Sequence, residues 1–241
     1  MSRKGWIYLL LAIVSCGVVL APVALAQDGA DGGGEEQAKG FVGQIFDSFI
    51  AILIVLLSVV SGALIIEHFM TLRRDKLIPP DILADIEVLF EEEEFGEAMD
   101  ICDADPTMLT NVMAAVIPKI GAGYDVMSQT MKDASEEEAI KLHQKISWLS
   151  LIGNIGPMMG LLGTVTGMIA AFRVIAASEE APSPKKLAGG ISTALITTTL
   201  GLIVAIPVMS FFFFFRNKIV RISMDLSAIC DDLIERFRPA E

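Results

Sequence analysis

Residues 153–167 read Gly-Asn-Ile-Gly-Pro-Met-Met-Gly-Leu-Leu-Gly-Thr-Val-Thr-Gly. The glycines follow one another at intervals of three and four residues, which places them on one stripe of a single helix. A stripe of small residues lets a second helix approach closely, and membrane helices associate in this way when burial brings no hydrophobic gain. The residues predicted to form this packing stripe are Gly153, Gly156, Gly160, Gly163 and Gly167.

The stripe lies in one of four runs that contain no Asp, Glu, Lys, Arg or His. These runs are 5–27, 48–66, 146–172 and 187–215, of 23, 19, 27 and 29 residues. About 20 apolar residues cross the hydrocarbon core of a bilayer, and a helix satisfies its own backbone groups there. We therefore expect an all-α integral membrane protein with three transmembrane helices after a signal peptide. The last two helices are long enough to extend into the cytoplasm, and a helical cytoplasmic segment separates the first span from the second.

The first run has two readings. Arg3 and Lys4 precede it and Ala24-Leu25-Ala26 ends it, which is the pattern of a signal peptide cleaved after Ala26. The alternative is a retained extra transmembrane helix. Both readings place residues 27–47 outside the cytoplasm.

Basic residues set the orientation, because Arg73, Arg74 and Lys76 follow the second run and Arg216 and Lys218 follow the fourth. The mature N-terminus is then outside the cytoplasm and the C-terminus is in the cytoplasm. The predicted order is a signal peptide (1–26), an acidic Gly-rich linker (27–40), a first span (41–66), a cytoplasmic helical segment (67–145), a second span (146–177), an external loop (178–186), a third span (187–215) and a cytoplasmic tail (216–241).

Composition and charge exclude several classes of function. The 241 residues are 53% hydrophobic, with a mean hydropathy of +0.60, which argues against a soluble enzyme domain. The net charge of −12 argues against nucleic-acid binding, which needs clusters of Lys and Arg. Three cysteines without CxxC or Cys/His spacing predict neither a disulfide framework nor a zinc site, and no metal or cofactor is expected.

The cytoplasmic segment should contain four helices. Pro79-Pro80-Asp81 predicts a helix start, Phe95-Gly96 and Asp105-Pro106-Thr107 predict breaks, a third helix over about 107–121 includes Pro118, and a fourth begins near Tyr124 and continues into the second span. The Glu91–Glu94 run is interpreted as a solvated face. His68 and His143 are interpreted as residues of the membrane boundary.

The fourth apolar run carries its own stripe of small residues, at Gly190, Ala194, Thr198, Gly201 and Ala205. A single membrane threonine usually bonds to a carbonyl of its own helix. The three threonines at 197–199 cover roughly 200° of the helix, however, so at least one should face a polar interior or a partner. No ionisable group lies in the centre of either long run, so a proton carrier would have to come from a partner.

Residues 160–167 and 190–207 together resemble the MotA/TolQ/ExbB proton-channel family, and its ExbB-like members in particular. The resemblance implies a non-enzymatic subunit that assembles as a pentamer around a dimeric, single-span ExbD- or TolR-like partner. An aspartate of that partner carries the proton, and a TonB- or TolA-like protein receives the energy. The threonines that line the path correspond to Thr164 and Thr198, with Thr193 and Thr197 beside them. ExbB proteins commonly carry a glutamate where this chain has Thr193, which leaves H⁺ and Na⁺ both open.

Competing hypotheses remain at this point. A TolQ-like or other motor subunit is a variant of the same idea, and a flagellar stator subunit would have four spans. A membrane scaffold, in which the threonines only pack, would conduct no ion. A membrane protease is disfavoured, because the spans lack a Ser/His or paired-Asp arrangement.

Overall fold

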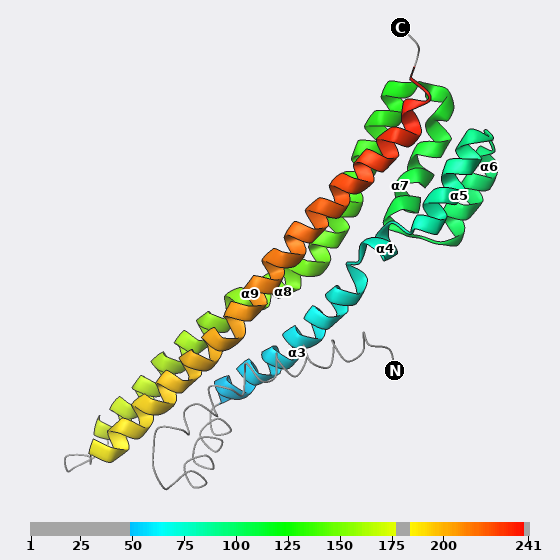
Figure 1. Cartoon of the computed structure of the whole chain (residues 1–241). Coiled ribbons are helices and arrows are strands. Elements are labelled where there is room, and N and C mark those ends of the chain that lie inside the picture. The colour runs from blue at the N-terminus through cyan, green and yellow to red at the C-terminus, as the bar shows by residue number, and fades with distance from the viewer. Residues whose placement is uncertain (1–48, 177–183, 239–241) are drawn as a thin grey trace, which may run out of the picture. The chain divides into compact units, whose positions relative to one another are not determined.

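The computed structural model of the protein describes residues 49–176 and 184–238 (Figure 1). Within these ranges all regular structure is helical: α3 (Phe49–Thr71), α4 (Arg74–Leu77), α5 (Pro80–Glu91), α6 (Phe95–Ala104), α7 (Met108–Val116), the 3₁₀ helix η1 (Ile117–Ala122), α8 (Tyr124–Ala176) and α9 (Pro184–Glu235). By length and composition, α3, α8 and α9 can each cross a membrane. The predicted all-helical class with three candidate spans is confirmed. The signal peptide, the linker and most of the external loop lie outside the described residues.

The described chain divides into two compact units. The first contains α3 up to Glu67 and the parts of α8 and α9 between Trp148 and Phe212. The second contains residues 68–147 and the end of α9 from Phe213. Each of the two long helices therefore contributes residues to both units.

In the first unit α8 and α9 run side by side in opposite directions (Figure 1). Pro157 and Pro207 lie inside these helices without ending them. A proline removes one backbone hydrogen bond, and in a membrane helix the freed carbonyl is satisfied by neighbouring groups. The helix start predicted near Tyr124 is confirmed, and α8 continues from there for 53 residues.

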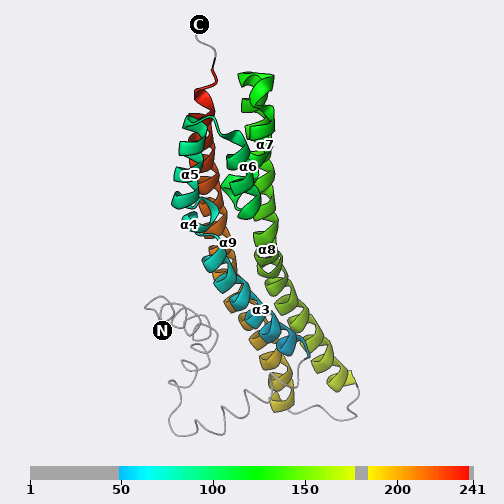
Figure 2. The same ribbon diagram turned by 90° about the vertical axis from the view of Figure 1, so that its right-hand side faces the viewer.

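The second unit has a core of large apolar side chains. The short helices α5, α6 and α7 gather beside the second-unit parts of α8 and α9 (Figure 2). The core residues with at most 3% exposure include Ile86, Phe90, Cys102, Leu109, Met113, Met127 and Met131. Burial, with a smaller contribution from Asp103, raises the pKa of the Cys102 thiol to about 11, so Cys102 is a neutral core residue at physiological pH.

Local sequence signals explain where these short helices begin and end. Pro80 occupies the first turn of α5, as predicted, where a missing N–H costs nothing. The predicted break before α7 is also confirmed: Thr107 is the N-cap, and its hydroxyl accepts from the Thr110 backbone N–H at 3.3 Å. The helix changes to a 3₁₀ helix at Ile117, next to Pro118, so η1 replaces the end of the helix predicted over 107–121.

The break predicted at Phe95-Gly96 is wrong in position. The turn between α5 and α6 is formed by Glu92, Glu93 and Glu94, and α6 begins at Phe95. Glu93 has a φ of +61°, and the Glu94 N–H donates to the Leu89 carbonyl at 2.9 Å. This pattern ends α5 by a left-handed residue of the kind usually supplied by glycine. Phe95 belongs to the helix because its ring packs against those of Phe90 and Phe237.

Helical structure continues past the predicted ends of the first and third spans. The first span was predicted over 41–66, and α3 continues as helix to Thr71. The third span was predicted over 187–215, and α9 continues as helix to Glu235, through most of the predicted tail. Within the second unit the ring of His68, predicted to lie at the membrane boundary, is buried and meets Phe215 edge-on with 5.7 Å between the centroids.

Candidate functional site

The predicted glycine stripe of α8 lies directly against α9. A Cβ added at Gly160 would lie 2.9 Å from the Thr198 Cα, and one at Gly201 would lie 2.6 Å from the Gly156 carbonyl oxygen. Cβ atoms essentially never come so close to backbone atoms. The two backbones therefore touch at a point where any larger residue would separate them.

The remaining glycines of the stripe meet side chains of the partner helix. Added Cβ atoms at Gly153, Gly163 and Gly167 would meet Met209, Thr197 and Ala194, and Gly190 of α9 faces Ala171 in the same way. Thus all seven glycines predicted to pack are brought into one intrachain contact. Sequence reasoning missed Met209, although the four-residue step of the α9 stripe, continued from Ala205, reaches it.

Thr198 differs from its neighbours by bonding across the contact. Its hydroxyl donates to the Gly160 carbonyl oxygen of α8 at 2.9 Å. The absence of a side chain at Gly160 is what gives the hydroxyl access to this carbonyl. The bond fixes the side chain of Thr198 at the closest point between the helices.

The neighbouring threonines follow the usual pattern of membrane hydroxyls. Thr197 is buried against Gly163 and donates to the Ala194 carbonyl at 2.7 Å, whereas exposed Thr199 donates to the Leu195 carbonyl at 3.0 Å. Of the three consecutive threonines, only Thr198 forms a hydrogen bond to another helix. Its acceptor is a carbonyl of the same chain, so the expectation that one of the three faces a polar interior or a partner stays a prediction.

Thr164 lies one turn after Gly160 on α8 and is half-buried. Its hydroxyl donates to the Leu161 carbonyl at 2.7 Å, and that of Thr166 donates to the Leu162 carbonyl at 2.9 Å. Within the described part of the chain, no hydrogen bond joins Thr164 to Thr198. The side chain of Thr193 lies outside those described.

These hydroxyls can accept a hydrogen bond, but they cannot take up or release a proton near neutral pH. Each donates its hydrogen to a carbonyl, which leaves its oxygen lone pairs available to a donor such as a protonated carboxylic acid. The apolar runs 146–172 and 187–215 contain no ionisable side chain. In the part of the chain that the structure describes, no group of three or more His, Cys, Asp or Glu residues could hold a metal ion. The chemistry open to this site is hydrogen bonding to a group that another molecule brings.

Comparison with known proteins shows that the part of the chain that contains α8 and most of α9 matches a known family. A sequence model of the MotA/TolQ/ExbB proton channel family matches residues 104–228, slightly more than half of the chain. This range includes α7, η1, most of α9 and the whole of α8.

Three relatives illustrate the similarity. Biopolymer transport protein exbB1 of Vibrio cholerae is 39% identical over 75 residues, which is 31% of this chain and 33% of that protein. Biopolymer transport protein ExbB of Xanthomonas campestris is 33% identical over 113 residues, or 47% and 44% of the two chains. The Tol-Pal system protein TolQ of Pseudomonas aeruginosa is 37% identical over 81 residues, or 34% and 35%. The chain thus spans less than half the length of each of these relatives.

Proposed function

Because the chain belongs to the MotA/TolQ/ExbB proton channel family, we propose that it is an ExbB-like subunit of an ion-driven complex in a bacterial inner membrane. It uses the proton-motive force to power outer-membrane transport through a TonB-like protein. The observation that carries this proposal is the Thr198 hydroxyl, which lies between two closely packed apolar helices and bonds to the Gly160 carbonyl. The relatives named ExbB support the assignment.

The proposed topology places three helices across the membrane. The signal peptide is removed, the mature N-terminus is periplasmic, and the C-terminus is cytoplasmic. Arg73 and Arg74 after α3, and Arg216 and Lys218 in α9, support this orientation by the positive-inside rule. The second unit, with its core of large apolar side chains, is then the cytoplasmic part.

The proposed complex is a pentamer of this chain around an ExbD- or TolR-like dimer. The second and third spans supply no carboxylate, so the partner's single transmembrane helix supplies an aspartate. When protonated, this aspartate donates a hydrogen bond to a threonine oxygen of the ring, and it releases its proton on the cytoplasmic side. Thr164 and Thr198 line the path, and Thr193 and Thr197 lie beside it.

Ion flux through the reconstituted complex tests the path. The full chain and its co-purified single-span partner are placed in proteoliposomes, and proton uptake is measured for Thr198→Val, Thr164→Val and the matched control Thr199→Val. We expect flux to fall about ten-fold in the first two variants, the effect of losing a hydrogen bond of about 1.4 kcal/mol. Flux in Thr199→Val should stay unchanged, because Thr199 is not among the residues proposed to line the path.

Native mass spectrometry of the same preparations separates conduction from packing. The proposal requires Thr198→Val to keep the wild-type subunit number while losing flux. Loss of assembly in that variant would give Thr198 a packing role, and wild-type flux would remove it from the path. The masses also identify the partner, so a TolR-like protein would move the complex to the Tol system. Absence of flux with any partner would support a scaffold.

A further inference from the structure

A concentration of positive charge lies where the apolar parts of α3 and α9 end. Residues 67–76 and 216–225 contain six basic side chains and three carboxylates, in a chain whose net charge is −12. The basic residues are Arg73, Arg74, Lys76, Arg216, Lys218 and Arg221. All of them belong to the second unit, so their arrangement is defined within one compact body.

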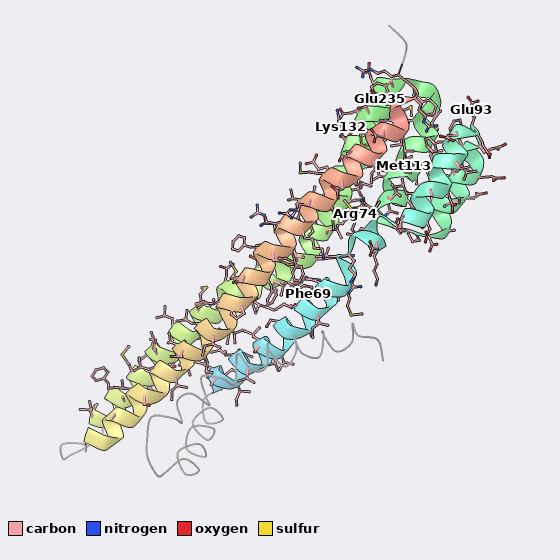
Figure 3. All side chains as sticks on the ribbon, viewed as in Figure 1. Phe69, Arg74, Glu93, Met113, Lys132 and Glu235 are labelled. Carbon is pink, nitrogen blue, oxygen red and sulfur yellow. The ribbon has the colours of Figure 1, made fainter. Side chains whose placement is uncertain are left out.

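Aromatic packing brings these two segments together. The ring of Phe69, near the end of α3, meets those of Phe214 and Phe215 with centroid distances of 5.9 and 5.0 Å. Further along, Arg74 Nε lies 3.5 Å from Asp225 Oδ2, which joins α4 to α9. Figure 3 labels Phe69 in α3 and Arg74 in α4.

Between these contacts, two cations are held near each other. Lys218 is half-buried, and the charge of Arg73 acts on its ammonium group. Within the two described ranges no ion pair joins Lys218 to a carboxylate, and Asp225 is paired with Arg74. A half-buried ammonium group without a paired carboxylate favours an anion beside it.

Apolar side chains beside the cations indicate the kind of anion. Phe214 precedes Lys218 by one helical turn on the same face of α9, and its side chain is 51% exposed. Met70, three residues before Arg73, is 48% exposed. A free phosphate gains nothing from such surfaces, whereas a phospholipid places its phosphate on the cations and its acyl chains along the apolar side chains.

We propose that Arg73 and Lys218 bind the phosphate of an anionic phospholipid in the cytoplasmic leaflet, with its acyl chains against Met70 and Phe214. The site is a specific lipid contact, distinct from the general attraction of a basic flank to the membrane. The inference rests on the proposed topology and not on ion conduction. Failure of the lipid contact therefore leaves the proposed function standing, and loss of ion flux alone leaves the lipid contact standing.

Lipid retention in native mass spectrometry tests the site on the full chain in mild detergent. The preparation is supplied with equal amounts of phosphatidylglycerol and phosphatidylcholine, and the bound lipids are counted. We expect Arg73→Gln and Lys218→Gln each to lower phosphatidylglycerol retention about five-fold, the effect of one basic residue at a membrane surface. Phosphatidylcholine retention should not change.

Three matched variants make the result decisive. Lys132→Gln removes an exposed lysine from another part of the same unit and should leave retention unchanged (Figure 3). Lys218→Arg keeps the charge and should keep the lipid, which separates lost binding from lost folding. Asp225→Asn removes the nearby carboxylate and should increase retention.

Several outcomes would overturn the proposal. Equal losses in Lys132→Gln and Lys218→Gln would indicate attraction to net charge without a site. Loss of the lipid in Lys218→Arg would indicate a structural role for the lysine. Displacement of phosphatidylglycerol by an equal concentration of inorganic phosphate would identify a free-anion site instead of a lipid site.

Discussion

The two units of this chain hold their helices together in different ways. In the first unit α8 and α9 meet through glycine, alanine and threonine, so closely that a Cβ at Gly201 would lie 2.6 Å from a backbone oxygen. In the second unit the helices meet through large side chains such as Phe90, Met113 and Phe215, which are at most 3% exposed. The first arrangement suits helices in lipid, where burying a leucine gains little, and the second suits helices in water. Close backbone approach is thus the packing expected in an apolar solvent, and a core of large side chains is the packing expected in water.

The strongest way to break the second unit is to empty its core. Met113 on α7 is fully buried (Figure 3), and Met113→Ala should cost about 2–5 kcal/mol in the free energy of unfolding, because the lost contacts leave a cavity. Thermal unfolding of the detergent-solubilised full chain, followed by circular dichroism, measures the change. The control is Met224→Ala on α9, where the side chain is 67% exposed and the expected change is within about 0.5 kcal/mol. Equal destabilisation by the two variants would contradict the core as described.

The first unit should instead be broken by adding a single carbon. Gly201→Ala places a methyl group against the Gly156 carbonyl, which is backbone and cannot turn away. We expect a cost of about 1–3 kcal/mol from the forced separation of α8 and α9, read from the same unfolding experiment.

Gly96→Ala is the matched control for the glycine experiment. This residue lies in the first turn of α6 in the second unit, with nothing within 4 Å of the added Cβ. The same substitution should therefore stabilise the chain there, by up to about 1 kcal/mol, because alanine loses less conformational freedom on folding. The comparison between the units would fail if both substitutions changed stability in the same direction.

Sequence periodicity was sufficient to predict the packing face of the first unit. Five glycines at three- and four-residue steps can share only one stripe of a helix, so Gly153 to Gly167 had to lie together. The hydrogen-bond acceptors of the threonine hydroxyls could not be predicted in this way. Thr197, Thr198 and Thr199 have the same side chain, and only the position of Gly160 opposite Thr198 distinguishes their bonds. That position depends on the register between two helices, which no local pattern contains.

In the second unit, helix ends could be predicted where a local residue restricts the backbone. They could not be predicted where contacts between distant residues decide the position of the end. Pro80 and the Asp105-Pro106-Thr107 sequence mark helix ends because proline and a capping threonine act locally. The α5–α6 turn was misplaced because Gly96 is the better candidate for a break by local preference. Phe95 is nevertheless held in α6 by ring contacts with Phe90 and Phe237, and Phe237 is 142 positions away in the sequence.

A substitution in the α5–α6 turn should change the free energy of unfolding by a smaller amount. Glu93 adopts a left-handed conformation, with a φ of +61°, which costs a non-glycine residue about 1–2 kcal/mol. Glu93→Gly should therefore raise the free energy of unfolding by about 1 kcal/mol, after allowing for the greater freedom of glycine in the unfolded chain. Glu92→Gly is the control, since Glu92 has a right-handed φ of −84° and should lose stability on the same change. A gain in both variants would point to relief of repulsion among the glutamates and not to backbone strain.

The smallest expected change in stability comes from an ion pair near the end of α9, and it can be compared with the ring contacts of the next residue. Arg236 Nη2 lies 3.0 Å from Glu91 Oε1, but the two side chains are 47% and 62% exposed. Solvent screens such a pair, so a double-mutant cycle of Arg236→Gln and Glu91→Gln should give a coupling of about 0.2–1 kcal/mol that shrinks at high salt. The next residue, Phe237, contacts the rings of Phe90 and Phe95, and Phe237→Ala should cost more than the whole ion pair and be insensitive to salt. If the ion pair had the larger effect, the second unit would be held together by charge, and its contrast with the glycine contact of the first unit would need a different explanation.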